Sequence, residues 1–212
     1  MTVDRPGAGE ELNEGPVVDA RPAASAILLR DSADGPEVLL LQRNPDARFM
    51  GGAWVFPGGS VHEADEREGV SGPVGAAMRE TEEECGLLIA APDELVPFSR
   101  WITPAQVKIR FDTWFFIARA PAGAEPEIDN AEVVAARWMR PQDALDAGAR
   151  DELLLVFPTI KHLEELAQFA TVAEALDEAR TRRVMPVEPR VLVDGGVARV
   201  LMPGEPGYDD VA

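Results

Sequence analysis

Cysteine and histidine are almost absent from this 212-residue chain, which has one cysteine, Cys85, and two histidines, His62 and His162. A single cysteine cannot form an internal disulfide, and this cysteine usage is typical of a reducing compartment. The same scarcity excludes a cysteine-based or histidine-rich metal site. A metal centre in this chain would therefore be built from carboxylates.

Positive charge is also scarce, because 20 Lys and Arg residues face 38 Asp and Glu residues and the net charge is −18. Only Lys108 and Lys161 are lysines, so the remaining cations are arginines. Such a charge repels the phosphates of duplex nucleic acid and of anionic lipid. We therefore expect neither a nucleic-acid duplex nor a membrane as partner. An anionic small molecule would need arginines, or divalent cations held by acidic side chains.

Long apolar runs are missing as well. No run approaches the roughly 18 residues that cross a bilayer, and residues 1–15 show no basic and then apolar export signal. Apolar residues make up 46% of the chain and charged residues 27%, a balance typical of a globular protein with a sizeable core. We therefore expect a cytoplasmic protein.

Three parts follow from the changes in composition along the chain. Residues 1–20 are rich in Gly, Pro, Glu and Asp without apolar periodicity, which predicts a flexible acidic leader. Residues 21–148 alternate short apolar runs with turns and form the expected main domain. Residues 149–212 predict two or three helices, interrupted at Pro158, and a small hairpin with a Gly-Gly turn, packed on the core.

The main domain has the pattern of an α/β fold. Hairpins are expected over residues 23–43 and 94–120, the second with its turn at Thr103 and Pro104, and single strands over residues 54–57 and 131–140. Apolar residues at three- and four-residue spacings predict a helix over residues 74–88 that stops at Gly86. A proline-initiated helix follows the last strand. These elements favour an α/β sandwich with a mixed β-sheet and a C-terminal helical extension.

The expected helix over residues 74–88 carries three carboxylates on one face. Glu80, Glu83 and Glu84 are three and four residues apart, whereas Thr81 and Cys85 point to the opposite, apolar side. Clustered carboxylates repel one another, and hard divalent cations such as Mg²⁺ prefer carboxylate oxygens. The alternative is a solvated acidic face on a surface helix. The nearby Phe-Pro-Gly-Gly run favours the metal site, because glycines let backbone carbonyls approach a ligand closely.

The acidic run resembles the signature of the Nudix family, which is G, five residues, E, seven residues and then R-E-U-x-E-E-x-G-U, where U is aliphatic. The residues that carry the resemblance are Gly59, Asp65, Arg79, Glu80, Thr81, Glu83, Glu84, Gly86 and Leu87. The chain departs from the signature in having Asp65 for Glu, Thr81 at an aliphatic position and six additional residues between Asp65 and Arg79. The resemblance covers about residues 22–146 and implies the Nudix α/β/α sandwich.

The resemblance implies metal ligands and a reaction. Glu80, Glu83, Glu84 and the carbonyl of Gly59 are the implied ligands of Mg²⁺, which Mn²⁺ can replace. Arg79 is expected to orient Glu83 or Asp65 through a salt bridge. The family role of Asp65 is open, since the insertion leaves Glu63 or Glu66 as substitutes.

The reaction implied is hydrolysis of the diphosphate bond of a small-molecule nucleoside diphosphate derivative. Glu83 and Glu132 are the candidate general bases. Glu132 lies six residues before Trp138, at the position where the family often carries a further acid. The alternative for Glu132 is an ordinary exposed loop glutamate. A second class of function is a non-catalytic Nudix-fold module that only binds its ligand.

The segment before the acidic helix resembles two groups within the family. Leu39, Leu40, Arg43, Arg48, Gly52 and Phe56 to Gly59 match the spacing found in coenzyme A pyrophosphatases. The Q-R, F-M and FPGG runs are similar to the proteins called nucleoside-diphosphate-linked moiety X motif 19, which are linked to CoA and acyl-CoA cleavage. ADP-ribose, NADH and nucleotide sugars remain alternative substrates.

Three residues of this segment are candidate substrate-binding residues. Arg43 and Arg48 could grip phosphates, or could be surface arginines at a strand end. Phe56 is the third candidate. Further along the chain, Trp101, Arg110 and Trp114 could line a pocket, although aromatic residues in strands are more often core.

A homodimer is a further hypothesis. It rests on the apolar residues of the C-terminal part, which are Leu153, Leu154, Leu155, Phe157, Leu163 and Leu166. In the alternative, these residues cover the sheet of their own chain.

Overall fold

The computed structural model describes residues 11–13, 15–47, 49–128, 130–194 and 197–211. Most of the expected leader, Arg48 and the expected Gly-Gly turn at residues 195–196 lie outside the described residues. None of the helices in the described ranges has the length and apolar composition to cross a membrane.

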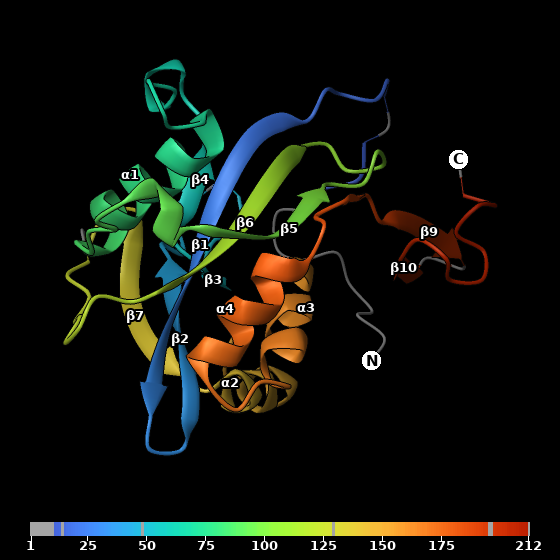
Figure 1. Cartoon of the computed structure of the whole chain (residues 1–212). Coiled ribbons are helices and arrows are strands. Elements are labelled where there is room, and N and C mark those ends of the chain that lie inside the picture. The colour runs from blue at the N-terminus through green and yellow to red at the C-terminus, as the bar shows by residue number, and fades with distance from the viewer. Residues whose placement is uncertain (1–10, 14, 48, 129, 195–196, 212) are drawn as a thin grey trace.

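Within the described residues, eight strands form one mixed sheet (Figure 1). The main order is β3-β2-β1-β6-β5-β8, while β4 pairs with β1 and β7 pairs with β2. The pairs β1·β6 and β5·β8 are parallel and the others are antiparallel. The strands are β1 (Arg21–Ser32), β2 (Gly35–Arg43), β3 (Trp54–Val55), β4 (Gly58–Ser60), β5 (Val96–Ile102), β6 (Phe111–Arg119), β7 (Val133–Met139) and β8 (Pro186–Val187).

Helices cover both faces of this sheet, so the expected α/β/α sandwich and the C-terminal helices are confirmed. Helix α1 (Gly72–Cys85) packs on one face, and α2 (Pro141–Ala149), α3 (Phe157–Leu166) and α4 (Val172–Thr181) pack on the other (Figure 1). Short 3₁₀ helices span Glu63–Asp65 and Pro92–Glu94. A separate hairpin of β9 (Arg190–Asp194) and β10 (Val197–Leu201) lies beside the main sheet.

Helix α1 ends where the sequence predicts. Gly86 adopts a left-handed backbone, with φ of 68°, and its N–H donates to the carbonyl of Glu82. Only glycine adopts this conformation without a steric cost, so the helix stops there. Thr81 and Cys85 are buried on the face that packs against the sheet. Burial raises the pKa of the Cys85 thiol to about 11.

Two expectations about the chain path are wrong. Pro158 does not interrupt a helix but lies in the first turn of α3, where a missing N–H leaves no helical hydrogen bond unmade. The strand expected over residues 54–57 is shorter, and Gly58 and Gly59 after it belong to a separate strand, β4, which pairs with Ser25 and Ala24 of β1. A side chain at Gly58 would place its Cβ 2.5 Å from the carbonyl oxygen of Ala24, so only glycine permits this pairing.

The apolar residues that motivate the dimer hypothesis are used mainly within the chain. Leu153, Leu163 and Leu166 belong to the core cluster between the sheet and helices α2 to α4. Leu154 is 44% exposed. The structure therefore supports the alternative for those three leucines, that they cover the sheet.

His162 of α3 is the most deeply buried ionisable group of this core. It is 1% exposed and lies among the rings of Phe56, Phe98 and Phe115. Its Nε2 atom is 2.6 Å from Ser99 Oγ, so one hydrogen bond joins α3 to β5. Burial lowers the pKa of His162 to about 3, since the surrounding rings cannot solvate the protonated imidazole.

The buried histidine predicts a loss of stability in mild acid. In the unfolded chain His162 takes up a proton below the ordinary histidine pKa of 6.5, whereas in the folded chain it stays neutral down to about 3. Unfolding therefore binds a proton between these values, and this contribution to stability is lost as pH falls from 6.5 towards 3. Relative to neutral pH, we expect the resulting loss in the free energy of unfolding at pH 5.5 to be about 1.4 kcal/mol.

Urea unfolding at pH 7.5 and at pH 5.5 measures this contribution. Because carboxylates also titrate in this range, the informative quantity is the difference in pH dependence between the wild type and His162→Gln. His62→Gln, at an exposed position, is the matched control. An unchanged pH dependence in His162→Gln would contradict the prediction.

Candidate active site

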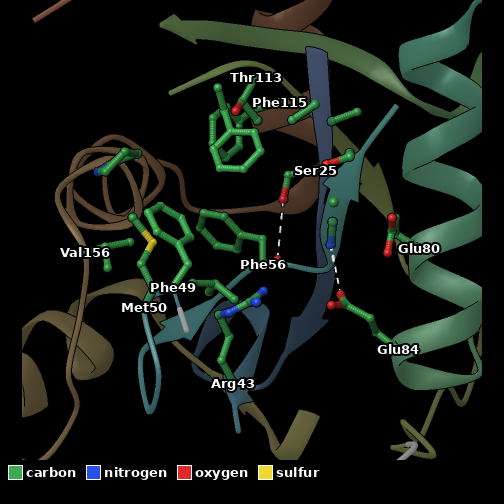
Figure 2. Close-up of a pocket in the computed structure, with 18 of the residues that line it drawn as sticks. Ser25, Arg43, Phe49, Met50, Phe56, Glu80, Glu84, Thr113, Phe115 and Val156 are labelled. Atoms are coloured by element: carbon green, nitrogen blue, oxygen red, sulfur yellow. Dashed lines mark hydrogen bonds between the residues drawn. The ribbon is translucent and has the colours of Figure 1, made fainter. Parts of the chain in front are cut away.

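One pocket of about 540 Å³ brings together the acidic face of α1 and an apolar wall (Figure 2). Glu80 and Glu84 lie on one side of it, and Arg43 and Ser25 lie between them and the apolar side chains opposite. The charged lining residues are Arg43, Arg79, Glu80, Glu83, Glu84 and Glu132, and His62 also lines this part. The apolar side chains include Phe49, Met50, Val55, Phe56, Phe111, Phe115 and Val156.

The acidic side depends on a close approach between β4 and α1. The Gly58 N–H donates a hydrogen bond of 2.9 Å to Glu84 Oε2. A Cβ at Gly59 would lie 2.3 Å from Glu80 Oε1, so a side chain there would displace this carboxylate. The N–H of Gly58 therefore helps to place the Glu84 carboxylate, and the missing side chain of Gly59 brings its backbone beside Glu80.

Glu84 and Glu80 are held in an environment that opposes their charge. Burial raises the pKa of Glu84 to about 7, and repulsion by Glu80 and Glu132 acts in the same direction. Burial is also the main cause that raises the pKa of Glu80, against the effect of Arg79. The Gly58 hydrogen bond and Arg43 favour the charged form of Glu84 but do not compensate the burial. The acidic side of the pocket therefore carries more negative charge than the arginines that line it, Arg43 and Arg79, can balance.

Arg79 is the charged residue that organises these acids. Its guanidinium makes two bonds to Asp65, of 2.8 and 3.0 Å, one bond of 2.8 Å to Glu80 and one of 2.9 Å to Glu83. It also donates to the carbonyl of Ser60. The planar fork of arginine suits these simultaneous contacts. Arg79 therefore contacts both residues that the sequence proposes as its partners.

Asp65 lies behind this site. It is 3% exposed, accepts a hydrogen bond from the His62 N–H at 2.7 Å, and is not a lining residue of the pocket. The hydrogen bond from Arg79 is the main cause that lowers the pKa of Asp65. Glu63 and Glu66, the alternatives left open by the sequence, are exposed. In this structure Asp65 is thus the acid that fixes Arg79.

Glu132 and Arg43 reach the pocket from neighbouring elements. Glu132 is exposed and lies just before β7, where its carbonyl accepts the Asn44 N–H at 2.8 Å. Arg43 ends β2, and its Nε atom is buried without a hydrogen-bond partner among the residues that the structure describes. A buried guanidinium nitrogen without an acceptor is energetically unfavourable, so an anionic ligand that supplies an acceptor there would be favoured.

The residues that the sequence suggested as pocket-lining in the β5–β6 region differ from those that line the pocket in the structure. Trp101, Arg110 and Trp114 are not among the described lining residues. Successive side chains of a strand point to opposite faces. Trp114 accordingly packs on the α1 side of the sheet, while Phe111, Thr113 and Phe115 line the pocket. Arg110 is 9% exposed and bonds Val18, Thr103 and Glu188.

The amino-acid sequence predicts only part of the pocket. Phe56 is buried and lines it, as proposed, whereas Arg48 lies outside the described residues. Phe49, Met50 and Val156 were missed, as were the alternate residues of β6. Two-residue periodicity along 111–115 could have identified the latter, because it separates one face of the strand from the other.

The acidic side fits a divalent cation in the chemistry of its donors. Hard cations prefer carboxylate and carbonyl oxygens, and here Glu80, Glu83, Glu84 and the Gly59 carbonyl are the available donors. Burial opposes the charge of Glu80 and Glu84 and raises their pKa values, so a bound cation would stabilise their charged forms. The described side chains form no group of three or more acids, His or Cys arranged around a metal position, and Arg79 pairs with Glu80 and Glu83.

Comparisons with known proteins agree with this site. The family model described as NUDIX domain matches residues 19–158. The chain is 28% identical to the putative nudix hydrolase 7 of Caenorhabditis elegans over 184 residues, covering 70% of this chain and 61% of that protein. It is 30% identical to the human acyl-coenzyme A diphosphatase NUDT19 over 133 residues, covering 58% of this chain and 35% of that protein. The chain thus spans less than two thirds of the length of either relative.

A solved structure shows the same similarity. The NUDIX hydrolase from Alicyclobacillus acidocaldarius superposes with a TM-score of 0.68 at 29% sequence identity. The superposition covers 75% of this chain and 96% of that chain.

The Arg79 contacts predict a large effect on stability. Replacing Arg79 with Ala leaves the buried Asp65 carboxylate without its partner. We expect a loss of about 2–4 kcal/mol in the free energy of unfolding, and a smaller loss in Arg79→Lys, which cannot make the forked contact. Urea unfolding at neutral pH measures the change.

The control is Arg140→Ala, which removes an exposed ion pair with Asp143. We expect little change there, because exposed pairs contribute little to stability. Equal unfolding midpoints for the two alanine variants would contradict the role assigned to Arg79.

Proposed function

Because the chain belongs to the NUDIX domain family, we propose that it hydrolyses the diphosphate bond of a nucleoside diphosphate linked to another group, with Mg²⁺ as cofactor and Mn²⁺ as a substitute. The observation that carries the proposal is the pairing of a partly buried carboxylate cluster with an open pocket beside it. Glu80 and Glu84 need a cation to balance their charge, and a diphosphate needs a cation to approach them.

The metal ligands that we propose are Glu80, Glu83, Glu84 and the Gly59 carbonyl. Mg²⁺ bound there would neutralise phosphate oxygens and the negative charge of the leaving phosphate. Arg79 is a positioning residue in this proposal, since it is fixed by Asp65 and orients Glu80 and Glu83 from behind. For the metal to bind, the carboxylates would exchange part of their contact with Arg79.

Glu83 and Glu132 remain the candidate general bases. Both line the pocket and both are exposed, so water can reach them. A general base accepts the proton of the attacking water and must lie within hydrogen-bond reach of it. Glu84 is a poorer candidate, because its carboxylate is buried and accepts the Gly58 N–H.

Arg43, which lies between the acidic cluster and the apolar side chains, is the proposed phosphate-binding residue. Its side chain projects into the pocket between the acidic and the apolar sides (Figure 2). The unpartnered Nε atom can donate to a phosphate oxygen. Phe56, at the border of the apolar side, is proposed to contact the group that the diphosphate carries.

CoA or acyl-CoA is the substrate that we favour. The support is the match of Arg43 and Phe56 to Gly59 to the spacing in coenzyme A pyrophosphatases, together with the similarity to a relative named acyl-coenzyme A diphosphatase. ADP-ribose, NADH and nucleotide sugars belong in the same test, because they also carry a diphosphate between two groups.

Product analysis by mass spectrometry tests the proposal. Purified protein with Mg²⁺ or Mn²⁺ is incubated with CoA, an acyl-CoA, ADP-ribose, NADH and a nucleotide sugar. We expect 4′-phosphopantetheine and 3′,5′-ADP from CoA. In Glu84→Gln we expect at least about a 100-fold lower kcat, because the charge that binds the cation is reduced.

Glu82→Gln is the matched control, since Glu82 is an exposed acid of the same helix that does not line the pocket. It should retain wild-type activity. Cleavage of another panel member would assign the protein to that substrate class. The absence of any metal-dependent product would overturn the proposal in favour of a module that only binds its ligand.

A further inference from the structure

The apolar half of the pocket is uncharged over all the lining residues that the structure describes. The pocket lining contains three threonines, Thr103, Thr113 and Thr159, of which Thr113 lies beside Phe115 in the apolar half (Figure 2). The remaining surface is aromatic and aliphatic, and Figure 2 shows Phe49, Met50, Phe56, Phe115 and Val156 gathered opposite Glu80 and Glu84. Threonine hydroxyls can bond amides and hydroxyls, whereas a second anion would lack a charged partner among these residues.

Met50 stands out in this half because of its backbone. Its φ is 52°, a left-handed conformation that is uncommon for a residue other than glycine, asparagine or aspartate. Glycine would adopt it without strain, yet the chain has a long side chain there and that side chain lines the pocket. A strained residue of this kind often marks a functional constraint.

The loop that carries Met50 is held firmly. The Met50 carbonyl accepts the Ala53 N–H at 3.1 Å, and Arg43 and Ala53 are joined by a backbone bond of 2.9 Å. A Cβ at Gly51 would lie 2.5 Å from the Pro45 carbonyl oxygen, so the turn is tightly closed. The backbone of Met50 is thus fixed, and the side chain alone can adapt.

Phe49 continues the same wall. The ring centroid of Phe49 is 5.6 Å from that of Phe111. Phe111 belongs to β6, which pairs with β1. Both residues line the pocket, so this contact joins the loop of Met50 to β6 within the apolar wall. The consecutive residues Phe49 and Met50 therefore both belong to the apolar wall opposite Glu80 and Glu84.

We propose that Met50, supported by Phe49, is a specificity-determining residue that limits the length of the uncharged group attached to the diphosphate. This inference rests on the proposed function and deepens it. The substrate class is a nucleoside diphosphate whose second group is uncharged and partly apolar, and this group lies against Met50. The flexible thioether side chain of methionine fits groups of different shape but still excludes long ones.

The test uses analogues of ADP in which a methylene replaces the oxygen between the phosphates, so that they cannot be hydrolysed at that bond. Their β-phosphate carries a methyl, butyl, hexyl, octyl or decyl ester. Calorimetry in Mg²⁺ gives each Kd for the wild type, Met50→Ala and Met50→Gly. The glycine variant also relieves the backbone strain, so reduced folding of one variant cannot imitate the effect. Met185→Ala, an exposed methionine that does not line the pocket, is the control.

In the wild type we expect affinity to rise with chain length, by up to about fourfold per methylene, until the chain reaches Met50. In both Met50 variants the length of tightest binding should increase by about two to three carbons, the length of side chain removed. The Met185→Ala profile should equal that of the wild type.

Measurable binding with the same length profile in all four proteins would overturn the inference and leave the proposed function standing. A shifted profile in the Met50 variants, from a protein that hydrolyses no diphosphate in the substrate panel, would overturn the proposed activity but support the inference. Absence of binding by every ester would overturn the inference, and the substrate panel would then decide the proposed function separately.

Discussion

The close approach of β4 to helix α1 is the constraint on which the site depends. Gly58 packs against the backbone of β1 and donates its N–H to Glu84, while Gly59 leaves room for the Glu80 carboxylate. A side chain at either glycine would move the strand or the acids. Because α1 is held against the sheet by its buried Thr81 and Cys85 face, the carboxylates on its other face are directed to one place.

This arrangement concentrates negative charge at a position with limited access to water. Arg79 stabilises part of it from behind and is itself fixed by the buried Asp65. The raised pKa of Glu84, to about 7, shows that the compensation is incomplete. The opposite half of the pocket carries uncharged side chains among the described residues. The pocket thus joins a region suited to a cation and phosphates to a region suited to an uncharged group.

Local patterns in the sequence are sufficient to predict much of the acidic side of the site. Helical spacing predicts the shared face of Glu80, Glu83 and Glu84, and Gly86 marks the end of α1, because both depend on residues that are close along the chain. The sequence predicts a salt bridge from Arg79 to Glu83 or Asp65, but it leaves the choice among Asp65, Glu63 and Glu66 open, since the additional residues before Arg79 leave several acids at similar distances in sequence. Phe49 and Phe111 lie far apart along the chain, and their rings meet at the pocket only through the pairing of the sheet. The prediction that Pro158 interrupts a helix was wrong because the sequence does not show where the helix begins, and a proline in the first turn cannot then be told from one in the interior.

The central claim is that the Glu84 region holds a divalent cation. A titration with Mn²⁺, followed by electron paramagnetic resonance of the free ion, tests it most directly in the wild type, Glu84→Gln and Glu82→Gln. The account predicts binding in the wild type, unchanged binding in Glu82→Gln, and at least about a tenfold weaker affinity in Glu84→Gln. Equal affinity in all three proteins, or no binding by the wild type, would contradict it.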